Sequence, residues 1–483
     1  MILLGAWLIL WTVCPSLCIA NIPIDVAENV AWGRQFEWGY DKNPYFGAWF
    51  SYAVFRHFPP VVAGYVFFML CQVSALLGLV AVYLIARDML PNRFQAFLIV
   101  PLALLIPFFG QSATEFNDDV LSMSLYGLTA LFVYRGVRRN TWSLWLGAGL
   151  CAGLALMTKY LAGILLLVLG CVLLFTSEGR KVWKKPWIYC GGVVCLLLVL
   201  PNVIWLFRHD FIAVAYALRR ANLDSSPTWM DHLVNFLRVW GYFLFWLILP
   251  LSALAIFRRD KAVDIAFFDR VWVNLLAWGP VGVSALFALL TGGEVRGAWT
   301  TPYFIFVTPA LVMWYRPLPE PRRLRFFAGF MISATALLLG VFAWEYLYSR
   351  PYLRDGCTFE TYPGKRVSDT LTRQWREAFA VPCRYVVGDR RTSCNMCYYS
   401  PDHPAAFFDH DVKLSPWIDL AEIRTHGAVF LWRKGEPRYL KQYPDLVMLP
   451  EMRYERAVPG WLRRWLSAPP DESIHAAFLP PRP

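Results

Sequence analysis

Charged side chains of both signs follow the first apolar run of the chain. Asp25 and Glu28 lie three residues apart, and Lys42 comes later in the same polar segment. On a helix, this spacing places both carboxylates on one face. A carboxylate can act as a base on a hydroxyl group, and a lysine can stabilise a departing phosphate. Charged groups held beside lipid are costly, so this segment is a candidate functional site.

The elements that must position these residues are mostly apolar. The 483 residues are 57% hydrophobic and have a mean hydropathy of +0.42, which is too apolar for a soluble protein of this size. Apolar runs of roughly 17–25 residues, each long enough to cross a bilayer as a helix, recur up to Leu347. They predict about eleven membrane-spanning helices, near residues 1–20, 60–86, 95–112, 119–135, 141–158, 160–176, 187–207, 234–257, 271–291, 301–315 and 326–347.

We therefore predict two domains. Residues 1–347 form an all-α polytopic membrane domain, and residues 348–483, which are polar and rich in proline, form a soluble α/β outer domain. The first outer loop, residues 21–59, is long enough for two amphipathic surface helices with aromatic anchors. We favour a retained membrane anchor over a cleaved signal peptide for Met1–Ala20, because this run has no basic segment before it.

Basic residues predict the orientation. Alternate loops are rich in Lys and Arg (near residues 87–93, 135–139, 180–185, 258–270 and 316–325), which marks them as cytoplasmic. The other loops and the C-terminal domain then lie on the outer side, which is the periplasm in a bacterium. The net charge of +12 is spread over many loops, so it indicates membrane topology and no nucleic-acid partner.

The cysteines fit this layout. Seven of the eleven lie in apolar runs, where they act as small apolar residues. The other four fall in the outer domain, and an oxidising compartment favours one or two disulfides among them: Cys357, Cys383, Cys394 and Cys397. The Cys394-Asn-Met-Cys397 spacing is also compatible with zinc or redox chemistry, but no second CxxC pair supports zinc.

The second outer loop ends in Asn117, Asp118 and Asp119, at the start of the fourth span. The aspartates could simply cap this helix, whose N-terminus favours negative charge. One acid is enough for a cap, so the others remain available for sugar hydroxyls or a cation. Lys159 separates two apolar runs at the outer boundary, either as a lysine that reaches the headgroups or as a phosphate ligand.

The remaining outer loops are rich in arginine, although basic residues are usually enriched in cytoplasmic loops. Arg219 and Arg220 follow His209 and Asp210, and Arg296 precedes the tenth span. Arginine binds two phosphate oxygens with its planar fork, so these residues indicate an anionic partner at the membrane surface. An amphiphile with a sugar-phosphate headgroup would satisfy the early acids and the later cations together.

The chain resembles the C-type integral-membrane glycosyltransferases that use polyprenyl-phosphate sugars. It is most similar to the bacterial branch with the lipid A aminoarabinose transferases, the lipopolysaccharide galacturonic acid transferases and the protein O-mannosyltransferases. The similarity rests on elements that occur in the same order along the chain: Asp25 with Glu28, Gly39-Tyr40-x-Lys42-x-Pro44, Asn117-Asp118, Thr158-Lys159-Tyr160, Pro201 to Phe211, Arg296 with Trp299 and Pro302, and, in the outer domain, Tyr362-Pro-Gly364 and Val387-Gly-Asp389.

Three positions depart from the pattern of this branch. The chain has Asn43-Pro44-Tyr45 where relatives commonly have His-Pro-Pro, and Asn202 where they often have a histidine. Asp25 and Glu28 are three residues apart, whereas the catalytic acids of relatives are often adjacent. These differences leave the reaction class intact and concern the identity of the sugar.

The resemblance implies a role for each candidate residue. Asp25 and Glu28 would be the catalytic acids, and the phosphate of the lipid-linked donor would be held by basic residues, namely Lys42, Lys159, Arg219, Arg220 and Arg296. The sugar or the acceptor would contact the remaining polar residues, namely Tyr40, Asn117, Asp118, Asp119, His209 and Asp210. No cofactor is certain, and a divalent cation at Asp118 and Asp119 is left open.

The resulting hypothesis is an inverting transferase of the bacterial inner membrane. It would move a sugar from an undecaprenyl-type phosphate to lipid A, lipopolysaccharide core or a related envelope acceptor on the periplasmic side. The chief alternative is transfer to a protein, as in O-mannosylation. A transporter of lipid-linked sugars is a weaker alternative, because transporters show internal repeats and ionisable groups at mid-membrane depth.

Overall fold

The structure is a computed structural model that describes residues 2–223, 227–260 and 265–482. Two compact units divide the chain. The helical unit consists of Met1–Ile9, Lys42–Phe46 and Leu70–Leu339. The mixed unit consists of Leu10–Asp41, Gly47–Met69 and Gly340–Pro483. Each unit is described separately below.

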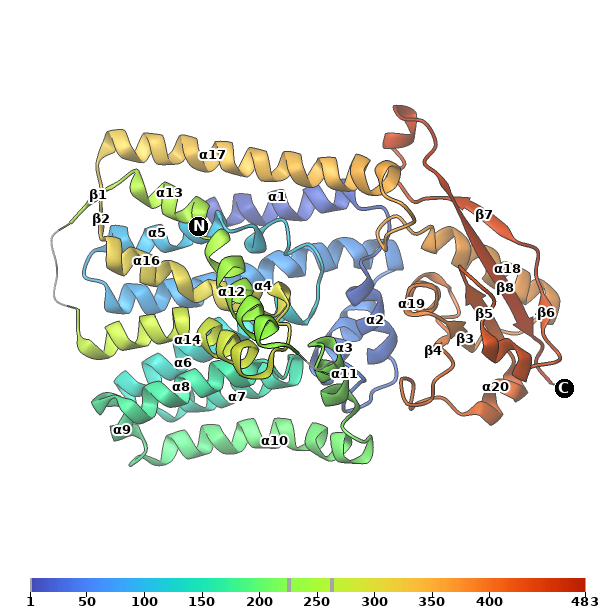
Figure 1. Ribbon diagram of the computed structural model, residues 1–483, viewed down its shortest axis with the longest axis horizontal. Helices are drawn as coiled ribbons and strands as arrows, with labels where there is room; N and C mark the ends of the chain where they lie inside the picture. Colours follow the sequence, from blue (N-terminus) through green and yellow to red (C-terminus); the bar gives the residue numbers. More distant parts are fainter. Residues whose placement is uncertain (1, 224–226, 261–264, 483) are drawn as a thin grey trace. The chain divides into compact units, whose positions relative to one another are not determined.

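Helices dominate the first three quarters of the chain (Figure 1). Their bounds are α1 Ile2–Cys18, α2 Ile24–Gly33, α3 Phe46–Phe55, α4 Pro60–Met89, α5 Arg93–Leu104, η1 Pro107–Phe109, α6 Asp118–Arg139, α7 Trp142–Thr158, α8 Ala162–Phe175, α9 Ser177–Val182, α10 Pro186–Arg208, α11 Ile212–Arg220, α12 Trp229–Phe245, α13 Ile248–Ala255, α14 Phe267–Thr291, α15 Gly297–Thr300, η2 Thr301–Phe306, α16 Val307–Tyr315 and α17 Pro321–Trp344.

Each of the eleven apolar ranges predicted from the sequence overlaps one of these helices. Within the described residues, five helices are long and apolar enough to cross a membrane: α4, α6, α10, α14 and α17 with its π-helical continuation to Leu353. A sixth candidate is the pair α12 and α13, which is bent by 43°. The other apolar helices are shorter, so the multi-pass architecture is confirmed and the count of eleven spans stays a prediction.

Small residues allow close helix packing in the helical unit. Helix α7 lies beside α6 and α10 (Figure 1). A Cβ atom added to Gly149 of α7 would overlap the carbonyl oxygen of Gly191 in α10, and one added to Gly191 would overlap that of Trp145. Glycine at both positions lets the two backbones approach, as is common between membrane helices.

The two helices predicted in the first outer loop are present as α2 and α3. Six of the last eight residues of α2, from Val26 on, are apolar or small, and all eight are buried. Helix α2 packs against α19, Arg390–Tyr399, within the mixed unit. The sequence did not indicate that residues 10–41 and 47–69 group with the C-terminal residues.

A sheet organises the C-terminal part of the mixed unit. The elements there are η3 Glu345–Leu353, α18 Gly364–Phe379, β3 Tyr385–Gly388, α19, β4 Ala405–Phe408, α20 Leu420–His426, β5 Ala428–Trp432, η4 Arg438–Gln442, β6 Val447–Met448, β7 Met452–Glu455, η5 Leu462–Arg464 and β8 Asp471–Leu479. The strand order is β4-β3-β5-β8-β6, and β7 also pairs with β8. Two further short strands, β1 Arg258–Arg259 and β2 Pro317–Leu318, pair in the helical unit.

Strands β3, β4 and β5 are parallel, whereas β8 runs antiparallel to β5. Strands β3 and β5 consist largely of buried apolar residues, the pattern of strands covered on both faces. Val387 pairs with Phe407 on one side and with Phe430 on the other, and all three are fully buried. A Cβ atom at Gly388 would lie 2.5 Å from the carbonyl oxygen of Leu431, so only glycine fits at this point.

The four cysteines of the C-terminal part are all buried. The Cys357 thiol donates a hydrogen bond to the carbonyl of Thr358 at 3.1 Å, and Cys383 donates to that of Tyr385 at 3.3 Å. Burial raises the pKa of the Cys397 thiol to about 12. These groups behave as buried apolar side chains with weak donors, so any disulfide pairing stays a prediction.

The glycine contact between α7 and α10 gives the first testable prediction. Gly191→Ala should lower the apparent melting temperature of the detergent-purified protein, because the added methyl group costs about 1–3 kcal/mol of overpacking. Gly192→Ala is the matched control, since a Cβ at Gly192 meets nothing within 4 Å. Equal melting temperatures for the two variants, measured by differential scanning fluorimetry, would contradict the packing described here.

Candidate functional site

An ion pair joins the ends of two helices in the helical unit. Lys159 directly follows the last residue of α7, and Asp119 lies in the first turn of α6. The Lys159 Nζ is 2.5 Å from Asp119 Oδ1, and the two side chains are only 15% and 16% exposed. The sequence predicted both as site residues, and the structure brings them into contact.

A second polar contact lies next to this pair. The Asn43 side-chain amide donates a hydrogen bond to Asp118 Oδ2 at 2.5 Å. Asn117, and neither aspartate, is the N-cap of α6, since its side chain accepts from the backbone N–H of Val120 at 3.0 Å. The aspartates are therefore free of the capping role and remain in the first turn, where the helix dipole stabilises their charge. We call Asn43, Asp118, Asp119 and Lys159 the polar cluster.

Tyrosines border the polar cluster. Tyr160 donates a hydrogen bond to the Asn202 side chain at 3.1 Å. Tyr303 donates to the carbonyl of Leu161 at 2.7 Å, and its ring packs against Tyr126 with centroids 5.4 Å apart. Asn202 is one of the positions where the chain departs from its relatives, and the structure shows that its side chain holds the neighbour of Lys159.

The other predicted phosphate ligands lie on nearby segments of the helical unit. The Lys42 ammonium lies 5.8 Å from the ring centroid of Tyr216 on α11, the helix that ends in Arg219 and Arg220. The backbone N–H of Glu294 donates to the carbonyl of Ala221 at 2.8 Å, which brings the loop before Arg296 to the end of α11. All three arginines are exposed.

His209 and Asp210 stand at the turn between α10 and α11. The His209 ring stacks on Trp205 with centroids 4.1 Å apart, and its Nδ1 lies 2.8 Å from the Trp205 carbonyl oxygen. Asp210 and Phe211 both have left-handed backbones, with φ near 51° and 52°. His209 is thus oriented by its own helix, and Asp210 shapes a tight turn.

The predicted catalytic acids belong to the mixed unit. Asp25 lies half-buried in the first turn of α2, and Glu28 is buried one turn later. Arg390, the first residue of α19, forms short ion pairs with Glu28 and with Asp41. The two carboxylates are 3% and 2% exposed. Glu28 therefore connects α2 to α19 through Arg390, a contact that the sequence did not predict.

Aromatic rings enclose this bridge. The Arg390 guanidinium lies 4.8 Å from the centroid of Phe408 and 5.6 Å from that of Trp32. Burial alone would lower the pKa of Arg390, but Glu28 and Asp41 raise it above its ordinary value, so the cation persists at every relevant pH. Tyr40 is fully buried beside the bridge, stacks on Trp32 at 5.1 Å and donates to its carbonyl at 2.8 Å. Tyr40 is thus part of the packing around the bridge.

Comparisons with known proteins agree with this arrangement. Residues 42–205, which include the whole polar cluster, match the family described as dolichyl-phosphate-mannose-protein mannosyltransferase. The lipopolysaccharide core galacturonosyltransferase RgtA of Rhizobium johnstonii is 25% identical over 325 residues. That match covers 64% of this chain and 62% of the relative, so the chain spans less than two thirds of the length of RgtA.

The fold has solved counterparts. The crystal structure of ArnT from Cupriavidus metallidurans in the apo state covers 99% of this chain and 97% of its own, with a TM-score of 0.56 and 14% identity. The structure of the same protein bound to undecaprenyl phosphate covers equal shares, with a TM-score of 0.58 and 15% identity. At such identities the likeness concerns the fold alone. Together, the family match, the relative and the fold support the GT-C superfamily of polyprenyl-phosphate glycosyltransferases.

The residues around Asp118 and Asp119 do not favour a metal there. One carboxylate accepts from the Asn43 amide and the other is paired with the Lys159 ammonium. Within the described residues, no group of three or more His, Cys, Asp or Glu side chains could hold a metal ion. We derive no step through a metal, and a divalent cation stays a prediction.

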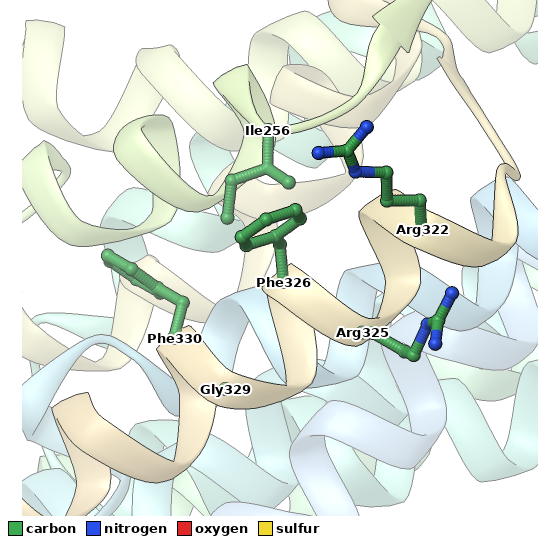
Figure 2. Close-up of a pocket in the computed structure, with 6 residues that line it drawn as sticks. All are labelled: Ile256, Arg322, Arg325, Phe326, Gly329 and Phe330. Carbon is green, nitrogen blue, oxygen red and sulfur yellow. The ribbon is translucent and has the colours of Figure 1, made fainter.

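A hollow of the helical unit lies apart from the predicted site residues. Figure 2 shows its lining from α17 and from the end of α13, where Phe326 points toward Ile256 and Arg322 extends from the same helix. Its volume is about 800 Å³, and Gly329 and Phe330 complete its apolar floor with Arg325 at the rim. Both arginines belong to a loop that the sequence predicts as cytoplasmic, which is consistent with arginines at a membrane surface.

The sequence did not predict two of the contacts made by the candidate site residues. Arg390 follows the Val387-Gly-Asp389 element, and nothing local marks it as the partner of acids more than 300 positions earlier. The contact of Asn43 with Asp118 was also not predicted. The sequence showed only that Asn43 follows Lys42 where relatives commonly have a histidine.

The Arg390 bridge gives a testable prediction. Arg390→Met leaves Glu28 and Asp41 buried without their cation, which costs about 3–5 kcal/mol when a buried pair is broken. We expect a markedly lower melting temperature and faster trypsin cleavage of the purified protein. Lys365→Gln is the control, because its pair with Asp369 is exposed at 55% and 49% and surface pairs contribute little. Equal stability of the two variants would contradict a structural role for Arg390.

Proposed function

We propose that the protein transfers a sugar from a polyprenyl-phosphate donor of the undecaprenyl type to an envelope glycolipid, namely lipid A, lipopolysaccharide core or a related acceptor. The observation that carries this proposal is the Lys159–Asp119 pair at the ends of α7 and α6. It lies inside the region that matches a polyprenyl-type phosphate sugar transferase family. A largely buried lysine held by one carboxylate can exchange that carboxylate for a phosphate.

The donor site consists of the polar cluster and its cationic neighbours. Lys159 binds the donor phosphate, and Lys42 lies in the same unit with its ammonium over Tyr216. Three exposed guanidinium groups can each bind two phosphate oxygens, those of Arg219, Arg220 and Arg296. Asn43 and Asp118 offer a donor and an acceptor for the hydroxyls of the sugar.

The proposed reaction needs one base and one stabilised leaving group. Asp25 accepts the proton of an acceptor hydroxyl, and the freed oxygen forms a bond to the anomeric carbon of the sugar. The bond between that carbon and the phosphate oxygen breaks on the opposite face, which inverts the configuration. The polyprenyl phosphate leaves as an anion next to lysine, so no general acid is required. Glu28 is held by Arg390, and we assign it to positioning α2.

Topology supports a site on the periplasmic side of a bacterial inner membrane. The loops rich in Lys and Arg mark the cytoplasmic face, and the segments that carry Lys42, Asp119, Lys159 and Arg296 belong to the opposite set. Lipopolysaccharide precursors are then accessible as acceptors before export.

Two alternatives differ in acceptor or in process. Transfer to a protein is favoured by the description of the matching family, which names a protein mannosyltransferase. A transporter would hold its ionisable groups near the middle of its helices. Lys159 and Asp119 lie at helix ends, which favours transfer over transport.

Replacement of the base tests the reaction. Asp25→Asn should reduce transfer by about 10²–10⁴-fold, the usual contribution of a general base, without a change in melting temperature. The assay follows loss of sugar from a purified undecaprenyl-phosphate sugar in proteoliposomes. Asp88→Asn is the control, since Asp88 pairs with Arg135 at the other end of the helices. Full activity of Asp25→Asn would exclude this mechanism.

The acceptor is identified in cells. Mass spectrometry of lipid A and core oligosaccharide from a deletion strain should show the loss of one glycosyl mass, which names both sugar and acceptor. Unchanged glycolipids together with a lost protein glycoform would instead establish the protein acceptor.

A further inference from the structure

The parallel part of the C-terminal sheet contains a reversal of strand order. From β3 the chain passes through α19 to β4 on one side, and then through α20 to β5 on the other side of β3. In open parallel sheets, ligands bind in the crevice outside the carboxyl ends of the strands at such a reversal. The reaction proposed above makes no use of this crevice.

A cavity occupies this position. Its volume is about 430 Å³, within the usual range of small-molecule sites. The residue after each parallel strand lines it, namely Asp389 after β3, Asp409 after β4 and Arg433 after β5. Tyr439 and Trp432 add aromatic surface to the wall. The cavity is therefore built by the topology of the sheet and lies wholly within the mixed unit.

The charges of the wall nearly balance. Arg433 pairs with Asp389 at 3.2 Å, and Glu472 pairs with Arg456 at 3.1 Å. Two cationic and two acidic side chains then remain on the wall: Arg391, Lys434, Asp355 and Asp409. The aspartates would repel a phosphate group, and the arginines would repel a simple cation. Alternating donors and acceptors of this kind suit hydroxyl groups, which both donate and accept.

Described side chains in and next to the wall carry buried hydrogen-bond donors without partners. Within the described residues, the Nε atoms of Arg391 and Arg433 and the hydroxyl of Tyr362 are buried and have no hydrogen-bond partner. Tyr362 is 1% exposed, and burial raises the pKa of its hydroxyl, with Asp389 adding to the effect, so it stays a donor. Buried donors are nearly always satisfied in native proteins, and two of these three belong to residues that line the cavity, Arg391 and Arg433.

We infer that this crevice binds a neutral saccharide, with Asp409 and Lys434 contacting its hydroxyls and Tyr439 contacting a ring face. Tyr439 is held in place by stacking on His410, with centroids 5.1 Å apart. The crevice is a carbohydrate-binding site separate from the residues assigned to transfer, so it can be present whether or not the proposed reaction is correct.

Saturation-transfer NMR on the full-length protein in nanodiscs tests the inference. The probes are D-galactose and D-mannose as neutral sugars and inorganic phosphate as the anion. We expect transfer to at least one hexose, and at least a tenfold weaker affinity in Asp409→Asn and in Lys434→Gln. The first substitution suits the backbone, because Asp409 has φ near 51°, a conformation that asparagine tolerates.

Lys413→Gln, an exposed lysine outside the cavity lining, is the matched control and should bind as the unchanged protein does. Hexose binding that is absent, or that is equal in Asp409→Asn, Lys434→Gln and the control, overturns the inference. Phosphate binding that depends on Lys434 overturns it as well, because the crevice would then be an anion site. Asp25→Asn should keep the hexose signal, which separates this site from the transfer reaction.

Discussion

A charged group near hydrocarbon must have a partner, and the helical unit is arranged around this constraint. Lys159 ends α7 and Asp119 begins α6, and their pairing fixes the ends of two helices that also pack along their length. The hydrogen bond from Asn43 to Asp118 brings a segment of the first loop to the same helix end. The ion pair is costly to bury and weak as a source of stability. We therefore propose that the pair is kept ready for an anionic ligand.

The mixed unit also pairs its buried charges, in this case one arginine with two acids. Arg390 lies between Glu28 and Asp41 and so joins α2 and the end of the first loop to α19. Helix α19 in turn follows β3, whose backbone approaches β5 so closely that Gly388 has no room for a side chain. The position of Asp25 on α2 thus depends on contacts with the C-terminal sheet, although Asp25 itself is far from that sheet in sequence.

The sequence predicted the local features and missed the pairings. Each apolar range predicted from the sequence overlaps a helix of the structure. Such ranges can be predicted because hydrophobicity over about 20 residues is a local property. Lys159 and Asp119 stood out because each interrupts or borders such a run. The partners of Glu28 and Asp118 are separated from them by 362 and 75 positions, and no local pattern encodes such contacts. The expected disulfides were inferred from the compartment and stay a prediction, and the structure shows that the four cysteines are buried.

Binding of undecaprenyl phosphate to purified variants tests the central claim most directly. If Lys159 exchanges Asp119 for the donor phosphate, Lys159→Met should weaken binding at least tenfold, measured with radiolabelled lipid in nanodiscs. Asp119→Asn should bind as tightly as the unchanged protein or more tightly, since it removes the competing carboxylate. Unchanged binding in Lys159→Met, with the protein still folded, would contradict the account.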